Sequence, residues 1–168
     1  MVDATLKQID AWFKEPSQGN DRPKLLSKLA VLELCGWIEA ELDRLIRKVG
    51  VSCSIEDDWV LKNVIDPNYS FSYLDHMRPM FCRLFGELFA RKVEAEMEQR
   101  YAGDLERFKS LLGTLSKKRN SFAHTHITGT TVVQITYDAP SWSINQFRLV
   151  HKFFMHYEEC LDAVAATF

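Results

Sequence analysis

The chain has 168 residues, 46% of them hydrophobic and 26% charged, so it can bury a core and is not expected to be disordered. Its length fits one domain, 1–168, and its 7 glycines and 5 prolines disfavour an all-β design. The formal net charge of −2 gives no general attraction to nucleic acids, so such a ligand would need a local basic patch. No apolar run approaches the roughly 20 residues that span a bilayer, and the first residues lack a signal-peptide pattern. We therefore expect a cytoplasmic protein with no membrane contact.

The N-terminal part of the chain is predicted to form one short and one long helix. The short helix, 3–14, and a loop make up an N-terminal segment, 1–22, and a helical bundle over 24–168 follows. The long helix spans 24–49, and Gly50 is expected to stop it. Its middle is apolar on almost every side, which is typical of the central helix of a bundle.

Shorter elements are predicted in the middle of the chain. A short helix or turn covers 53–65, and the next helix begins near Ser70 or Ser72. Pro79 falls inside that helical pattern, so we expect a kink or a late helix start there. The pattern continues as a charged helix over 87–100.

Two long helices are predicted to end the chain. The first begins at Asp104, a suitable N-cap, and runs to about His124. A β-branched, alternating stretch then predicts a small β-hairpin or extended insertion near 127–138. Ser143 and Gln146 form a capping box that opens the last helix. The fold class is therefore predicted to be all-α, an up-and-down helical bundle with this one insertion. The last helix is expected to direct these residues inward: Ile144, Phe147, Val150, Phe153, Phe154, Tyr157, Leu161 and Val164.

The four cysteines are scattered and form no metal-binding or redox motif. They are Cys35, Cys53, Cys82 and Cys160. All except Cys53 lie within apolar helical patterns, so we expect buried, reduced thiols rather than zinc ligands or disulfides.

An arginine on an apolar face marks the candidate functional site. At about 100° per residue, Arg119 falls on the same helix face as Leu112 and Leu115. Asn120 and His124 are four residues apart and share the neighbouring face. A guanidinium is costly to bury without a partner, so Arg119 should pair with a carboxylate, bind an anion, lie at a subunit contact or extend its head group into water.

The segment from Arg119 to His124 resembles the signature of the HEPN superfamily, in which an Arg precedes a His by four to six residues late in a helix. Within that superfamily the chain is most similar to the bacterial RiboL-PSP group. A second similarity is the phrase over 37–42, which includes Glu39 and resembles the core helix of the superfamily. The resemblance implies a helical bundle, usually dimeric. Many members are metal-independent RNA endonucleases of toxin–antitoxin or phage-defence systems, in which two copies of the motif face one cleft.

The residue types suit RNA cleavage by the RNA's own 2′-hydroxyl. His124 is assigned as general acid and base because imidazole titrates near neutral pH. Arg119 is assigned as the clamp on the negatively charged transition state. Asn120 would orient His124 or bind phosphate, and Lys117 and Lys118 would attract the RNA backbone.

Further candidates for supporting or metal-binding roles are Glu39, Glu33 and His126. Glu39 is expected to pair with Arg119, either to position the guanidinium or as a purely structural ion pair, and Glu33 is a second candidate for that role. His126 lies two residues after His124, but no further ligand stands at suitable spacing, so we expect no metal and no cofactor.

Three functions remain open on these grounds. The first is an RNA endoribonuclease with a composite active site in a homodimer, controlled by an antitoxin or another defence-system partner. The second is a noncatalytic HEPN module that dimerises or binds nucleotides or RNA. The third is a helical bundle without an active site.

Overall fold

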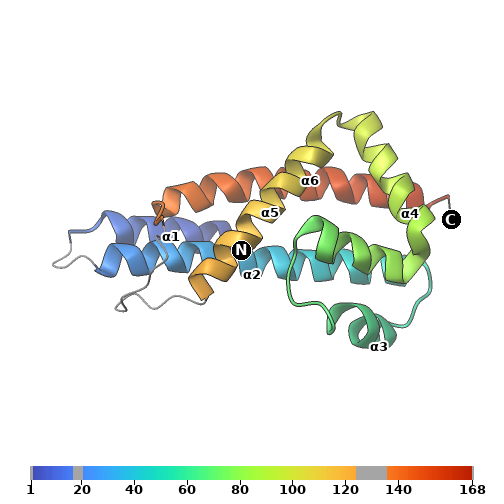
Figure 1. Cartoon of the computed structure of the whole chain (residues 1–168), viewed down its shortest axis with the longest axis horizontal. Helices are drawn as coiled ribbons and strands as arrows, with labels where there is room; N and C mark the ends of the chain where they lie inside the picture. The colour runs from blue at the N-terminus through green and yellow to red at the C-terminus, as the bar shows by residue number, and fades with distance from the viewer. Residues whose placement is uncertain (1, 17–20, 124–135, 168) are drawn as a thin grey trace. The chain divides into compact units, whose positions relative to one another are not determined.

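The computed structural model describes residues 2–16, 21–123 and 136–167. Every regular element within these ranges is helical, which confirms the predicted all-α fold. Most of the predicted insertion near 127–138 lies outside the described residues, and 136–138 have no regular structure. The elements are α1 (Val2–Lys14), α2 (Asp21–Ser52), α3 (Asp57–Val60), the π-helical turns η1 (Leu61–Ile65) and η2 (Tyr73–Met77), α4 (Arg78–Arg100), α5 (Asp104–Ala123) and α6 (Pro140–Ala165) (Figure 1).

The chain comprises two compact units. Unit 1 consists of Met1–Trp37 and Thr114–Leu149, and unit 2 consists of Ile38–Gly113 and Val150–Phe168. Helices α2, α5 and α6 contribute residues to both units. The single domain expected from the chain length stays a prediction.

Unit 1 is held together by apolar contacts among four helices. Leu6 and Ile9 of α1 are fully buried, as the spacing of apolar residues predicts for an amphipathic helix. The ring edge of Trp37 on α2 meets Phe147 on α6, with ring centroids 4.9 Å apart. The Cys35 thiol of α2 donates to the carbonyl oxygen of Leu115 on α5 at 3.8 Å.

Unit 2 is built around an aromatic core centred on Tyr157 of α6. The Tyr157 ring lies 5.6 Å from Phe81 on α4, 6.0 Å from Phe108 on α5 and 6.2 Å from Tyr73 on η2, measured between ring centroids. Each of these four side chains is fully or almost fully buried. The predicted inward residues of the last helix are all buried, so its amphipathic pattern is confirmed.

Two predicted helix boundaries are wrong, for different physical reasons. Helix α2 continues through Gly50 to Ser52, and Gly50 is buried. A Cβ at this position would stand 3.0 Å from Cγ2 of Val60, so the glycine permits close packing instead of ending the helix. Helix α6 begins at Pro140, where a missing N–H costs nothing, and buried Ser143 lies inside its first turn.

Helix α4 contains a break that the sequence analysis did not predict. Helical structure begins at Tyr73 as the turn η2, close to the start expected near Ser70 or Ser72, and α4 continues it directly from Arg78. Pro79 therefore lies near the start of α4, where a missing N–H is tolerated. Within it, Gly86 has φ 81° and ψ 169°, a conformation available essentially only to glycine. The two arms of α4 therefore run in different directions (Figure 1).

Candidate functional site

The predicted site begins in the last turns of α5. The helix opens at Asp104 after Gly103, whose φ of 77° allows the tight reversal from α4. Leu112 and Leu115 are fully buried, as the apolar spacing predicted. Helix α5 ends at Ala123, so Arg119 lies within its last two turns.

Arg119 is half-buried and contacts its neighbour in sequence. Its Nη1 donates to Oδ1 of Asn120 at 3.2 Å, while Asn120 itself is exposed. Adjacent residues on a helix do not face each other, so the long arginine side chain reaches across the helix surface to make this contact. The amide of Asn120 is thus one of the groups that orient the guanidinium.

Lys118 is held by the protein itself. Its side chain is 17% exposed, and its Nζ forms an ion pair with Oδ2 of Asp138 and donates to the carbonyl oxygen of Thr136 at 3.3 Å. The same ammonium lies over the rings of Trp142 and Phe122, 4.8 and 5.6 Å from their centroids. The charge of Lys118 is therefore compensated by a carboxylate and by aromatic faces.

The neighbouring Lys117 differs from Lys118. It is exposed, and no described residue forms an ion pair or hydrogen bond with it. The ring of Phe122 stacks on Tyr137 at 5.5 Å, which adds to the attachment of 136–138 at this end of α5. Of the two lysines predicted to attract phosphate, Lys117 is thus the one that solvent and ligands reach freely.

The remaining residues of the predicted site are His124, His126, Glu39 and Glu33. His124 and His126 lie outside the described residues. Glu39 is half-buried and belongs to unit 2, whereas Arg119 belongs to unit 1, so their pairing stays a prediction. Glu33 is exposed on α2 in unit 1, away from the buried face of that helix.

A second cluster of polar residues joins α5 to α6 within unit 2. Oδ2 of the buried Asp104 accepts from Nδ1 of His156 at 3.0 Å and from Nζ of Lys152 at 3.2 Å. Burial alone would raise the pKa of Asp104. The bonds from Lys152 and His156 outweigh this effect, so the pKa of Asp104 lies below its ordinary value. The His156 ring stacks on Tyr101 at 3.7 Å. The sequence analysis did not predict this cluster, which fastens the start of α5 to α6.

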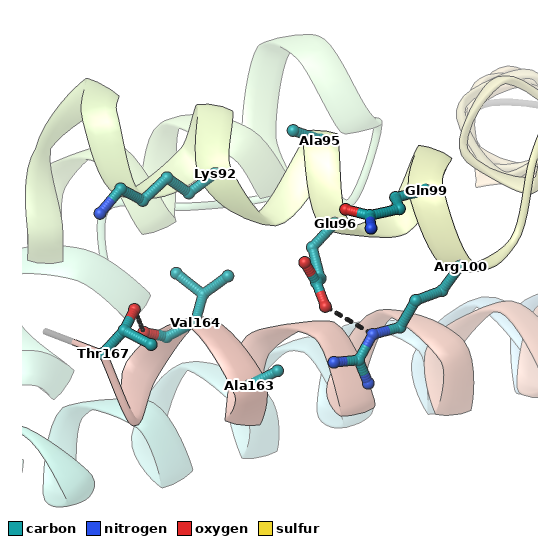
Figure 2. Close-up of a pocket in the computed structure, with 8 residues that line it drawn as sticks. All are labelled: Lys92, Ala95, Glu96, Gln99, Arg100, Ala163, Val164 and Thr167. Carbon is teal, nitrogen blue, oxygen red and sulfur yellow. Dashed lines mark hydrogen bonds and ion pairs between the residues drawn. The ribbon is translucent and has the colours of Figure 1, made fainter.

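A groove of about 480 Å³ lies between α4 and α6 in unit 2 (Figure 2). Lys92 and Arg100 stand at its opposite ends, and Ala95 and Ala163 leave room between the helices. Nε of Arg100 donates to Oε1 of Glu96 at 2.5 Å, so a carboxylate already compensates one of the two cations. The groove therefore has no strong preference for an anion, and we assign it no ligand.

Within 2–16, 21–123 and 136–167, no group of three or more His, Cys, Asp or Glu side chains is placed to hold a metal ion. None of the described helices is long and apolar enough to cross a membrane. No protein-family model, curated protein or solved structure matches the chain. The residues of the site are therefore the basis for assigning a function.

Proposed function

We propose that this protein is a metal-independent RNA endonuclease of the HEPN type, acting in a toxin–antitoxin or phage-defence system. The observation that carries the proposal is the position of Arg119, which is half-buried in the last turns of α5 and is contacted by the amide of Asn120. A guanidinium held by an amide at a helix end, five residues before a histidine in sequence, is suited to clamp a phosphodiester. The exposed ammonium of Lys117 adds attraction for the RNA backbone.

The proposed reaction uses the RNA 2′-hydroxyl as the nucleophile. One imidazole takes the 2′-hydroxyl proton while the 2′-oxygen forms a bond to phosphorus. The bond from phosphorus to the 5′-oxygen breaks, and a second imidazole donates a proton to that leaving oxygen. Arg119 stabilises the extra negative charge of the intermediate phosphorane. The products carry a 2′,3′-cyclic phosphate and a 5′-hydroxyl, so neither water nor a metal ion takes part in this step.

The proposal requires two copies of the chain. Arg119 and His124 are five residues apart, about 140° around an ideal helix, so one copy would not place both side chains on one phosphate. In a homodimer with a twofold axis, the arginine of each copy would meet the histidine of the other. The second imidazole that the reaction needs would come from the same pairing.

The direct test compares purified wild-type protein with Arg119→Ala and His124→Ala on an end-labelled RNA in the presence of EDTA. Each variant is expected to lose at least about a hundredfold in cleavage rate, because each lacks a group that acts in the transition state. His151→Ala, which removes an exposed histidine of α6, is the matched control and should cleave normally. Undiminished cleavage by either site variant would contradict the proposal.

Mixing wild type with a doubly substituted chain tests the composite site. A heterodimer of wild type with Arg119→Ala/His124→Ala keeps its one arginine and its one histidine on the same copy. If the site is assembled between copies, an excess of the double variant should, after mixing and re-equilibration, remove most of the wild-type activity. If each copy carries its own complete site, the activity per wild-type copy stays unchanged and the composite arrangement is wrong.

One observation favours a second candidate, a noncatalytic module that binds nucleotides or RNA. The charge of Lys118 is compensated by Asp138, and the chain as a whole has a formal net charge of −2, so the attraction for RNA is modest. A dimer that binds RNA without cleaving it, and equally well after His124→Ala, would favour this module over the nuclease.

A further inference from the structure

The outer face of α2 in unit 1 carries an apolar strip. Leu25 and Leu29 are 52% and 38% exposed, and Leu32 is half-buried. Together with Gly36 they follow a spacing of four, three and four residues, which confines them to roughly 60° of arc on an ideal helix. The described residues therefore leave a continuous stripe along this helix uncovered.

The neighbouring helix also exposes a large apolar side chain. Trp12 of α1 is 42% exposed, and its carbonyl oxygen accepts from Nη2 of Arg22 near the start of α2 at 3.2 Å. Single exposed apolar residues are normal on a protein surface. A strip of apolar residues with helical spacing is instead typical of a surface that another element covers.

The strip leads into a hollow between α1 and α2. The hollow has a volume of about 340 Å³ and is lined by Val2, Thr5, Leu32, Glu33, Gly36 and Trp37. A Cβ added at Gly36 would meet no atom within 4 Å, so the missing side chain opens a notch in the surface of α2. A large apolar side chain from outside fits such a notch.

The edge of the strip bears a single negative charge that lacks a partner. Glu33 is exposed and lies about 40° around the helix from Leu29, beside the hollow. No residue in the described part of the chain forms a hydrogen bond or ion pair with its carboxylate. A partner with a lysine or arginine at the matching position would be attracted to this edge, and one with a carboxylate there would be repelled.

We propose that this surface docks an amphipathic α-helix of another protein. The partner's apolar face would cover Leu25 and Leu29 and place one large side chain in the notch at Gly36, while a basic residue pairs with Glu33. A helix suits the site because its apolar residues recur with the same spacing as the strip. This inference does not depend on the nuclease proposal, since no residue of the surface takes part in the proposed cleavage.

The experiment uses two synthetic helical peptides with the same leucine face. One carries lysine beside that face and the other carries glutamate at the same position. Fluorescence anisotropy with the full-length protein should show saturable binding, with the lysine peptide bound roughly threefold more tightly, as expected for one exposed ion pair. Glu33→Lys should reverse this preference.

Three further variants test the strip itself. Leu29→Ser and Gly36→Gln should each weaken binding about tenfold, because the first removes apolar contact and the second fills the notch. Gly36 is an exposed helical position with open space, so Gln there should not lower the melting temperature. Leu88→Ser is the matched control: Leu88 is 63% exposed in unit 2, and this change should leave binding unaltered.

Defined outcomes would overturn the proposal. One is the absence of saturable binding by either peptide to correctly folded protein. A second is that Glu33→Lys still binds the lysine peptide more tightly than the glutamate peptide. A third is that Leu29→Ser and Leu88→Ser lose binding to the same extent. If sedimentation shows that the free protein is a dimer and that Leu29→Ser dissociates it, the surface belongs to a second copy of this chain instead.

Discussion

The ammonium of Lys118 lies 4.8 Å from the centroid of the Trp142 ring and so joins the end of α5 to the start of α6. An ion pair with Asp138 completes the surroundings of this cation. The adjacent Lys117 is exposed and makes no comparable contact with the described residues. Two neighbouring lysines of the candidate site are therefore expected to contribute differently, one to stability and one to ligand attraction.

The first prediction separates these two contributions. Lys117→Ala should reduce the slope of log binding constant for single-stranded RNA against log salt concentration by about 0.7, because one phosphate contact is lost. Its thermal stability should stay unchanged. Lys118→Ala should leave the slope unchanged but lower the free energy of unfolding by about 1 to 2 kcal/mol, since Asp138 loses its partner. Salt titrations measure the slope, and urea denaturation measures the stability. If Lys118→Ala reduces the slope and Lys117→Ala does not, Lys118 leaves Asp138 to bind RNA.

The second prediction concerns two glycines with equal space but different backbone conformations. An added Cβ meets nothing within 4 Å at either Gly36 or Gly86, but Gly86 has φ 81° and Gly36 is helical. Gly36→Ala should raise the free energy of unfolding by about 0.5 to 1 kcal/mol through helix propensity. Gly86→Ala should lower it by about 1 kcal/mol or more through backbone strain. Urea denaturation of both variants measures these changes. If Gly86→Ala also stabilised the protein, α4 would not be broken at Gly86.

The third prediction is a pH dependence that arises from Glu158. Hydrogen bonds from Arg44, and then from Lys48, lower the pKa of Glu158 to about 2. Because the unfolded chain binds this proton at a higher pH than the folded protein, the stabilisation is complete above about pH 5 and is lost as the pH falls towards 2. Both partner side chains are more than a third exposed, so we expect a contribution of about 1 to 2 kcal/mol at neutral pH.

Glu158→Gln should therefore destabilise the protein at pH 7 and flatten its stability between pH 5 and pH 2, as measured by urea denaturation. Glu106→Gln is the control, because Glu106 is 73% exposed and its ion pair is with the nearby Lys109. A profile that is as steep in Glu158→Gln as in the wild type would assign the acid sensitivity to other groups.

The fourth prediction is an order of cysteine reactivity. Cys53 and Cys82 are half-exposed, whereas Cys35 and Cys160 are buried. Burial raises the pKa of Cys82 and raises that of Cys160 to about 11, which lowers the thiolate fraction of both. Native protein should be alkylated by iodoacetamide first at Cys53, then at Cys82, and at the buried pair only on unfolding. Peptide mass spectrometry gives this order directly, and early labelling of Cys160 would mean that α6 opens locally.

Much of the helical architecture follows from local patterns in the sequence. The bounds of α1, the start of α5 and the buried face of α6 agree with the predictions, because helical periodicity and capping involve residues that are close in the chain. Gly50 shows where local reasoning fails. A glycine is a common stop signal, but here the close contact with Val60 favours a residue without a side chain inside the helix.

The candidate site was predictable to a similar extent. Arg119 and Asn120 were expected near the end of a helix and are found there. The partner of Lys118 was not expected, because Asp138 is 20 residues away and no local pattern joins the two. The cluster around Asp104 and His156 was missed for the same reason, since its members are 52 residues apart.

By itself, the order of amino acids determined that this chain is helical and which side of each amphipathic helix is buried, since both depend on a repeat of a few residues. Only the tertiary structure decided which charges are compensated, where the close approach of Val60 favours a glycine and which leucines of α2 stay exposed. Ion pairing, burial and docking depend on distances between segments that are far apart in the chain. Those distances are set by tertiary packing, which local sequence patterns do not determine.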